Sequence, residues 1–319
     1  MTQFEDMTEE EQKAWWMQQA KILLKGYLPD AQIAWLAYTH NAVFDVVHKR
    51  GHFVLRVHDK NDMRQVTSEE TILMQLNTSQ LSAPKPIQVM SDENTTTVGL
   101  LLTHLDGMSQ TAKTVSLPEM QAIGNYLAKM HKVSFQAENR PTLDYRGLFG
   151  KNGVYHLSDE SRKVFTDEQI IVMDTVAEKV KLAMDELGAS DSEFGLIHGD
   201  FLLKNILFHE GDVRALDFEY CGWGYYLYDL TPLLWQLKPQ DRYPELEQAL
   251  WDGYSSIRPL NTRHRELLET FIAARQVASM RWVAANRHNP AYQGKVEGIM
   301  GQRTAELRGF LETGVLKRK

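Results

Sequence analysis

The chain has 319 residues, 43% of them hydrophobic, which suffices for one large domain or for two packed lobes. Its net charge of −7 argues against a nucleic-acid-binding protein, because such proteins usually carry a basic face. The single cysteine excludes a disulfide framework within the chain, and no segment approaches the ~18 uninterrupted apolar residues of a membrane span. The acidic N-terminus lacks the layout of a signal peptide. We therefore expect a soluble, cytoplasmic protein that binds neither nucleic acid nor membrane.

The first third of the chain combines one leading helix with short strands. Thr8 and Glu11 form a capping box, and apolar residues then recur at helical spacing, which predicts a helix over residues 8–28. β-Branched and aromatic residues alternate with polar ones in the segments that follow, and this pattern predicts strands. The expected strands are residues 42–48, 52–58, 86–90 and 95–105, with a helix over 66–76. Residues 30–105 therefore predict a small antiparallel sheet with one inserted helix.

The remaining chain is mainly helical. Ser116 and Glu119 form a second capping box, and helical periodicity predicts helices over 117–132, 166–187, 243–258, 260–287 and 295–312. Residues 194–220 interrupt this pattern with two short apolar strands on either side of a turn at Glu210. We expect an α+β fold with an N-terminal lobe over 1–105 and a helical lobe over 106–319. The connection would be residues 99–107, with an active site in a cleft between the lobes.

One run of polar residues lies inside that interrupting segment. It begins with His198-Gly199-Asp200, continues with Asn205 five residues after the aspartate, and ends with Asp217-Phe218-Glu219. Phosphoryl transfer to a hydroxyl requires a carboxylate that orients the hydroxyl and oxygen ligands for Mg²⁺. Asp200, Asn205 and Asp217 supply these groups, and the predicted hairpin can fold the last two against each other.

This ordered set, followed by the tail GWGYYLYDL with Asp229, resembles the aminoglycoside phosphotransferase and choline kinase-like family of the protein-kinase-like fold. It is most similar to the bacterial homoserine kinase type II and RdoA-like group. The resemblance covers most of the chain and implies ATP and Mg²⁺ as cofactors. It makes Asp200 the catalytic base, with His198 bracing the catalytic loop. The resemblance further implies a catalytic and Mg²⁺-binding Asn205 and a Mg²⁺-binding Asp217.

Two further carboxylates acquire roles from the same resemblance. Asp229 would orient the catalytic loop from behind, and Glu219 would share in a second metal ion. His198 has an alternative role as a metal ligand, since His-x-Asp spacing occurs in metallohydrolases. No second histidine follows at a spacing such as H-x-x-x-H, which disfavours that role.

The small lobe is expected to hold the nucleotide. Val54 and Arg56 alternate onto one face of their strand, so Val54 would cover the adenine and Arg56 would meet phosphate. The alternative for Arg56 is an edge-strand side chain that faces solvent. Glu69 stands where a helix partner for Arg56 belongs, and Glu70 is its alternative.

The segment at the start of the first expected strand, residues 39–43, contains no glycine, so the glycine-rich loop of protein kinases is missing. Asn41 in that segment would contact phosphate or form an Asx-turn. Thr103 and Leu105, in the connection, would offer backbone groups to adenine.

The acceptor is expected to be a small-molecule alcohol. Leu202 stands where protein Ser/Thr kinases usually carry a lysine, and no A-P-E motif follows the metal-binding aspartate. An amino sugar, an amino alcohol or a hydroxy amino acid would fit. The alternatives are a protein Ser/Thr kinase of the RdoA type and a non-catalytic nucleotide-binding scaffold. A monomer and a homodimer are both consistent with the sequence. The expected acceptor residues are Trp223, Tyr225, Arg275 and Trp282.

Overall fold

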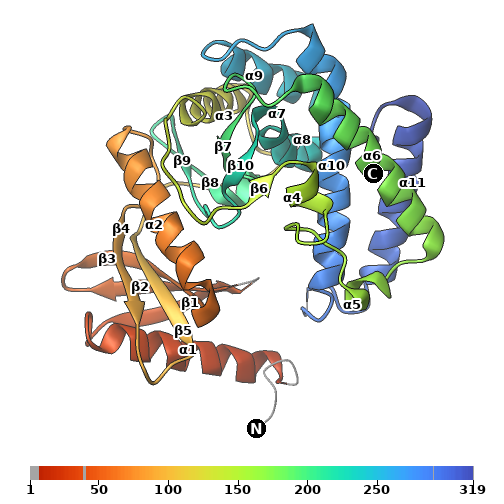
Figure 1. The fold of residues 1–319 in the computed structure, drawn as a ribbon. Helices are drawn as coiled ribbons and strands as arrows, with labels where there is room; N and C mark the ends of the chain where they lie inside the picture. Colours follow the sequence, from red (N-terminus) through yellow and green to blue (C-terminus); the bar gives the residue numbers. More distant parts are fainter. Residues whose placement is uncertain (1–6, 39–40, 290, 319) are drawn as a thin grey trace. The chain divides into compact units, whose positions relative to one another are not determined.

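The structure is a computed structural model that describes residues 7–38, 41–289 and 291–318 (Figure 1). The chain divides into two compact units. Unit 1 comprises residues 1–106 and 135–139, and unit 2 comprises residues 107–134 and 140–319. The chain leaves unit 1 after Asp106. No helix among the described residues is both long enough and apolar enough to cross a membrane.

Unit 1 is built on a five-stranded antiparallel sheet in the order β1-β2-β3-β5-β4. The expected strands are confirmed, but the edge strand β1 was not among them. The strands and helices are β1 (Gln32–Tyr38), β2 (Ala42–His48), β3 (Gly51–Asp59), β4 (Pro86–Ser91), β5 (Thr97–Thr103), α1 (Glu9–Lys25) and α2 (Met63–Thr78), with a short 3-10 turn, η2 (Lys60–Asp62), before α2.

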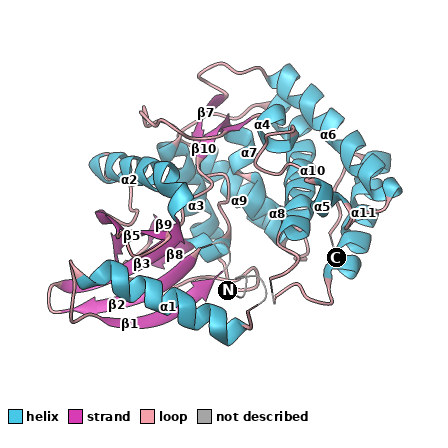
Figure 2. Cartoon of the chain, turned by 60° about the horizontal axis from the view of Figure 1, so that its bottom comes forward, coloured by secondary structure: helices cyan, strands magenta, loops and turns pink. Residues whose placement is uncertain are grey.

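The two helices of unit 1 cover opposite faces of this sheet. Leu24 of α1 belongs to the same apolar core as Leu55 of β3. The next residue of β3, Arg56, points to the other face, because successive side chains of a strand alternate. There it pairs with Glu69 of α2. Figure 2 shows α1 lying against the strands of unit 1. The sequence therefore directs an apolar face of the sheet to α1 and a face with polar side chains to α2.

Residues 135–139 belong to unit 1 although they lie between segments of unit 2. The Gln136 carbonyl accepts a hydrogen bond from Gln75 of α2 at 2.8 Å, and the Glu138 carbonyl accepts one from Ser68 at 2.5 Å. These side-chain contacts attach the segment to α2. No sequence pattern indicated this return of the chain.

Unit 2 is mainly helical, and its five long predicted helices are confirmed. The capping boxes at Ser116 and Thr166 begin two of them. The helices are α3 (Leu117–Met130), α4 (Tyr145–Phe149), α5 (Asp159–Arg162), α6 (Asp167–Leu187), α7 (Tyr226–Asp229), α8 (Thr231–Leu237), α9 (Tyr243–Ser255), α10 (Thr262–Ala285) and α11 (Val296–Thr313).

Two small sheets of unit 2 carry the polar run found in the sequence. One has the order β6-β10-β7, and the other is the hairpin of β8 and β9. The five strands are β6 (Thr142–Leu143), β7 (Phe194–Ile197), β8 (Ile206–His209), β9 (Asp212–Ala215) and β10 (Gly222–Tyr225). A 3-10 turn, η3 (Leu203–Asn205), leads directly into β8. Strand β7 therefore ends where the His198-Gly199-Asp200 segment begins.

Helices α3 and α9 pack closely because glycines lie at their contact. A Cβ atom on Gly124 would meet the Leu250 carbonyl oxygen at 2.3 Å, and one on Gly253 would meet the Gln121 carbonyl oxygen at 2.1 Å. Only glycine allows the two backbones to approach this far. His131 follows the last residue of α3, and Tyr254 lies on α9, so this close packing places both residues near the His198-Gly199-Asp200 segment.

Candidate active site

Residues 198–205 form a loop, which we call the catalytic loop after its predicted role, and Asp229 holds its start. The Asp229 carboxylate accepts hydrogen bonds from the backbone N–H groups of His198 and Gly199, each at 2.8 Å. The His198 ring Nε2 donates to the Leu216 carbonyl at 2.9 Å. Gly199 has a φ of +78°, which non-glycine residues rarely adopt. These contacts fix the backbone immediately before Asp200.

His131 supplies a third donor to Asp229. Its Nε2 lies 2.9 Å from Asp229 Oδ2, and its Nδ1 lies 2.8 Å from the Tyr254 hydroxyl. We assign a neutral imidazole that donates through Nε2 and accepts through Nδ1. Burial holds the pKa of His131 below its ordinary value. Burial alone would raise the pKa of Asp229, but the hydrogen bonds and charges around it leave that pKa lowered. The pair is therefore a carboxylate facing a neutral histidine.

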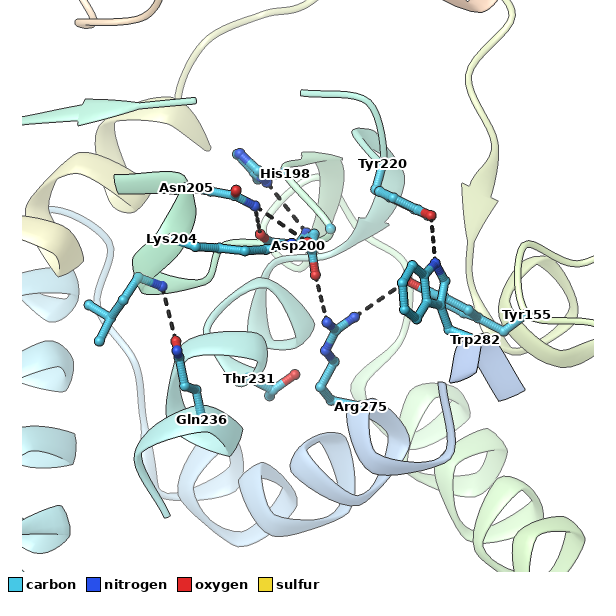
Figure 3. A network of polar contacts seen from close by, with 12 residues as sticks. Tyr155, His198, Asp200, Lys204, Asn205, Tyr220, Thr231, Gln236, Arg275 and Trp282 are labelled. Carbon is cyan, nitrogen blue, oxygen red and sulfur yellow. Dashed lines mark hydrogen bonds and ion pairs between the residues drawn. The ribbon is translucent and has the colours of Figure 1, made fainter. Parts of the chain in front are cut away.

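Asp200 is 7% exposed and lies among three nitrogen donors (Figure 3). Arg275 Nη2 lies 2.6 Å from its Oδ1. Asn205 Nδ2 donates to the Asp200 backbone carbonyl at 2.8 Å and to its Oδ2 at 3.3 Å, and Lys204 Nζ lies 3.6 Å from Oδ2. Burial alone would lower the pKa of Arg275, but the charge of Asp200 holds it above its ordinary value. Donors on both carboxylate oxygens of Asp200 thus fix the orientation of the group.

The β8–β9 hairpin brings Asn205 and Asp217 together. Ile206 pairs with Ala215, and beyond that pair the Leu216 N–H donates to the Asn205 carbonyl at 2.8 Å. Because the Asn205 amide nitrogen already donates to Asp200, the amide oxygen is the atom that it can offer to a cation. Asp217 has a φ of +63°, in the left-handed region that non-glycine residues rarely adopt. Such strain is concentrated at functional sites.

Glu219 follows two residues later and is 6% exposed. Its backbone carbonyl accepts a hydrogen bond from Arg140 Nη1 at 2.9 Å. Carboxylate and amide oxygens are the ligands that Mg²⁺ prefers. The donor set of Asn205, Asp217 and Glu219 therefore fits that cation in its chemistry.

In unit 1 the structure selects Glu69 over Glu70 as the partner of Arg56. Arg56 Nη1 lies 2.5 Å from Glu69 Oε1, and their side chains are 6% and 1% exposed. Arg56 is therefore not a solvent-facing edge residue. Val54 lies two residues earlier on the same face of β3. Burial raises the pKa of the neighbouring Glu70.

The other residues expected near the nucleotide also lie in unit 1. Asn41 is buried directly before β2, whereas Thr39 and His40 lie outside the described residues. Thr103 exchanges hydrogen bonds with Lys85: its N–H donates to the Lys85 carbonyl, and its hydroxyl accepts from the Lys85 N–H, each at 2.9 Å. Among the hydrogen bonds of the described chain, none uses the backbone of Leu105. Leu105 thus has backbone groups to offer, while the Thr103 N–H is already occupied.

The acceptor residues separate into two groups. Arg275 and Trp282 both lie on α10 and belong to the contacts around Asp200 (Figure 3). Tyr225 is a core residue: its hydroxyl donates to the Met184 carbonyl at 3.1 Å, and its ring packs edge-on against Phe271. We therefore withdraw Tyr225 from the acceptor residues.

Trp223 lies on the middle strand of its sheet, paired with Leu196 on β7 and Thr142 on β6. Among the described residues, no contact connects its side chain with Asp200. The structure therefore adds nothing to the sequence argument for Trp223.

Two tyrosines near Asp200 were missed from the sequence. Arg275 Nη1 lies 3.4 Å from the Tyr155 hydroxyl, and the Trp282 indole N–H donates to the Tyr220 hydroxyl at 2.9 Å. The two tyrosine rings stack with centroids 6.3 Å apart. Tyr220 directly follows Glu219, which was a usable signal. Tyr155 lies in a loop without regular periodicity, and only the fold brings it here.

Comparison with known proteins adds independent findings. The model of the phosphotransferase enzyme family (APH) matches residues 37–267. An uncharacterised protein of Deinococcus radiodurans is 32% identical over 154 residues, which are 45% of this chain. The chain spans only 40% of that protein's length in the match.

Solved structures share the fold at low sequence identity. A microcompartment-associated aminopropanol kinase has a TM-score of 0.80 at 19% identity, covering 94% of this chain and 99% of its own. An amicoumacin kinase in complex with AMP-PNP, Ca²⁺ and its ligand has a TM-score of 0.75 at 17% identity, covering 95% and 96%. A choline/ethanolamine kinase family protein from Mesorhizobium loti has a TM-score of 0.67 at 18% identity, covering 93% and 95%. Because the family match extends over more than half of the sequence, the chain belongs to the phosphotransferase enzyme family.

Proposed function

We propose that this protein transfers the γ-phosphoryl group of ATP, with Mg²⁺, to a hydroxyl of a small-molecule acceptor. The observation that carries the proposal is the arrangement of the polar run in unit 2. The β8–β9 register brings Asn205 beside the residue that precedes Asp217, and Asn205 also donates to Asp200. A carboxylate for the acceptor hydroxyl and oxygen ligands for a cation thus come from one short segment.

Asp200 has the position and contacts of a residue that orients an acceptor hydroxyl. Its two oxygens are held by Arg275 and Asn205, so the carboxylate cannot rotate freely. Such positioning is the main contribution that a protein makes to phosphoryl transfer. Asp200 would also receive the hydroxyl proton. Asp229 would keep the loop in place through its bonds to the His198 and Gly199 amides.

Asn205 and Asp217 are the residues that would hold Mg²⁺, and Glu219 would share in a second ion. When bound, Mg²⁺ neutralises charge that develops on the β- and γ-phosphates. In unit 1, Arg56 would meet phosphate while Glu69 fixes the direction of its guanidinium. Val54 and the backbone of Leu105 would contact the adenine.

Three observations favour a small acceptor over a protein. The similar structures named above are kinases of aminopropanol, of amicoumacin and of the choline/ethanolamine group. Asp229 follows Asp217 after a short strand and one helical turn, which leaves no room for a long activation segment. Leu202 also stands where protein kinases usually carry a lysine. An amino sugar, an amino alcohol or a hydroxy amino acid remains the expected class.

The proposal is tested with purified protein in two measurements, ADP release across hydroxylated metabolites and calorimetric titration with MgATP. We expect Asp200→Asn to lower turnover at least a hundredfold and to leave MgATP affinity nearly unchanged. Asp217→Ala should remove the metal-dependent part of that affinity. Asp212→Asn is the matched control, because Asp212 is an exposed carboxylate in the same hairpin.

The outcomes separate the alternatives. Near-normal phosphorylation by Asp200→Asn would reject the catalytic role. Titration that detects MgATP but no turnover with any acceptor, and no slow hydrolysis without acceptor, would favour a nucleotide-binding scaffold. Transfer of radiolabel to a general protein substrate would favour a protein Ser/Thr kinase.

A further inference from the structure

Three arginines from three parts of unit 2 surround one indole ring beside the catalytic loop. The ring belongs to Trp235 of α8. The centres of the guanidinium groups lie 5.8 Å from its centroid for Arg275, 5.4 Å for Arg303 and 3.7 Å for Arg318. The arginines come from α10, from α11 and from the segment after α11. We call Arg275, Arg303 and Arg318 the arginine cluster.

The indole is held firmly, and its helix also holds the catalytic loop. Trp235 Nε1 donates to Gln276 Oε1 at 2.6 Å, and its carbonyl accepts from Arg318 Nη1 at 2.6 Å. The next residue, Gln236, accepts a hydrogen bond from the Leu203 N–H at 3.0 Å (Figure 3). One helix therefore supports both the arginine cluster and the segment that carries Asp200.

The positive charges of the cluster are incompletely balanced. Arg275 pairs with Asp200, and Arg318 Nε lies 3.7 Å from Glu306 Oε2. Among the described residues no carboxylate forms an ion pair with Arg303, and its Nη1 is buried without a hydrogen-bond partner. Lys204 adds a further positive charge 3.6 Å from Asp200. A buried guanidinium nitrogen without a hydrogen-bond partner is unfavourable, and an anionic ligand would supply that partner.

The neighbours of Arg303 reinforce this argument. Its backbone carbonyl is fixed by Gln276 Nε2 at 3.3 Å. Burial lowers the pKa of Arg303 below its ordinary value; Tyr292 and Glu306 oppose that shift, and the positive charge of Arg275 adds to it. An oxyanion bound by Arg303 would supply the missing partner of Nη1 and offset the repulsion from Arg275, because arginine forks match carboxylate and phosphate oxygens.

We propose that the acceptor carries an anionic oxygen group, a carboxylate or a phosphate, which Arg303 and Arg275 bind while Asp200 takes the acceptor hydroxyl. This inference rests on the proposed function and narrows its substrate class to hydroxy acids and hydroxylated phosphate esters. Arg275 contacts Asp200 directly, so the anionic group would be bound beside the residue that takes the hydroxyl. Amino alcohols that lack an acidic group are then poor acceptors.

The acceptor hydroxyl oxygen forms a bond to the γ-phosphorus, and the bond between that phosphorus and the β–γ bridging oxygen breaks. The hydroxyl proton passes to Asp200, and ADP leaves with the electron pair of the broken bond. The anionic group of the acceptor takes no part in bond formation. Arg303 would therefore act on acceptor binding more than on turnover.

The test compares acceptors that share a skeleton and differ in one group. The first series is 4-hydroxybutyrate, its amide and 4-amino-1-butanol, and the second is glucuronate, glucose 6-phosphate, glucose and glucosamine. ADP release is measured for each, and binding to protein loaded with AMP-PNP and Mg²⁺ is measured by calorimetry. We expect a carboxylate or phosphate acceptor to exceed its neutral and amine counterparts at least tenfold in kcat/KM or in affinity. In the second series, the better acceptor of glucuronate and glucose 6-phosphate shows whether the bound group is a carboxylate or a phosphate.

Arg303→Gln should raise the KM of the preferred acid at least tenfold, with kcat and the KM of ATP changed less than threefold. Arg308→Gln is the control, since Arg308 is an exposed arginine on the same helix that pairs with Glu168. A neutral or cationic acceptor equal to its acid, no binding of any acid in either series, or an unchanged acid KM in Arg303→Gln would each overturn the inference. If the unmodified protein does not bind MgATP at all, the proposed function is rejected instead.

Discussion

Asp229 and His131 lie 98 positions apart in the sequence, yet the His131 Nε2 lies 2.9 Å from the Asp229 Oδ2 inside unit 2. Both side chains are fully buried. The pair connects the end of α3 with the backbone that precedes Asp200, so the catalytic loop depends on a contact distant from it in sequence.

Replacing Asp229 tests this dependence. Asp229→Asn loses the charge that three N–H donors stabilise and turns one acceptor into a donor. We expect the free energy of unfolding to fall by about 3 kcal/mol and kcat to fall with it. Urea denaturation and ADP release measure the two effects. Asp252→Asn, at an exposed position on α9, is the control and should change neither. Unchanged stability of Asp229→Asn would show that the carboxylate is dispensable for the loop.

The neutral state of His131 predicts a pH dependence of stability. Its folded-state pKa lies below the ordinary value of 6.5, so the unfolded chain binds more protons as the pH falls through 6.5. Stability is therefore fully present above pH 6.5 and decreases on acidification below it, by at most about 1.4 kcal/mol per pH unit. The lowered pKa of Asp229 removes stability only at still lower pH, below its ordinary 3.8.

Urea midpoints at pH 7.5, 6.5 and 5.5 measure this slope. His131→Gln should flatten it, whereas His209→Gln, at a partly exposed position in the β8–β9 hairpin, should leave it as it is. Equal slopes in His131→Gln and the unmodified protein would contradict the assignment.

The buried pair of Arg56 and Glu69 can be separated into structural and binding roles. Arg56→Met leaves Glu69 buried without its cation, and we expect a loss of about 3–5 kcal/mol. Replacing both by Met should recover most of that stability, because an apolar pair of similar volume is often tolerated. Nucleotide binding should not recover, since the cation proposed to contact phosphate is absent.

Thermal unfolding and MgATP titration distinguish the two roles. Glu70→Gln is the control, and we expect little change in either measurement. Normal MgATP affinity in the double variant would show that Arg56 has only a structural role.

The left-handed backbone conformation of Asp217 lowers the stability of the folded protein. Its φ of +63° is unfavourable for a residue with a Cβ, so Asp217→Gly should raise the free energy of unfolding by about 0.5–1 kcal/mol. The same change should abolish metal-dependent nucleotide binding. Glu210, with a φ of +51° in the turn of the same hairpin, is the matched control. Glu210→Gly should gain similar stability and retain activity, and destabilisation in both variants would contradict the strain argument.

The contact of α3 with α9 predicts a sharp difference between two glycines. Gly124→Ala would bring Cβ to within 2.6 Å of the Tyr254 amide nitrogen, and the backbone cannot yield without moving the helix. We expect a loss of about 1–3 kcal/mol. Gly309→Ala on α11 meets nothing within 4 Å and should gain about 0.5–1 kcal/mol through its higher helix propensity. Thermal unfolding of both variants checks the prediction.

The fold and the centre of the site could be predicted because their signals are local. Capping residues marked helix starts, alternation marked four strands of the sheet, and Asp200, Asn205 and Asp217 lie close together in sequence on either side of one hairpin. Arg56 and its helix partner were predictable because strand alternation fixes the direction of Arg56. The edge strand β1 was not predicted, because one of its faces is exposed and its alternation of buried and exposed residues is less regular.

The remaining features depend on tertiary structure. His131 and Tyr254 meet Asp229 only because α3 and α9 pack through glycines. Tyr225 adjoins the motif in sequence but faces the core, whereas Trp282, far along the chain, reaches Tyr220. Arg303 had no signal of its own, since exposed and buried arginines on a helix look alike in sequence.

The β8–β9 hairpin also limits how the gene can vary in length. Four residue pairs and a turn at Glu210 and Gly211 set the register that places Asn205 opposite Leu216. Inserting or deleting a single codon on one strand would turn its following side chains to the opposite face and separate the proposed cation ligands. Insertions and deletions that preserve activity should therefore be confined to loops outside this hairpin.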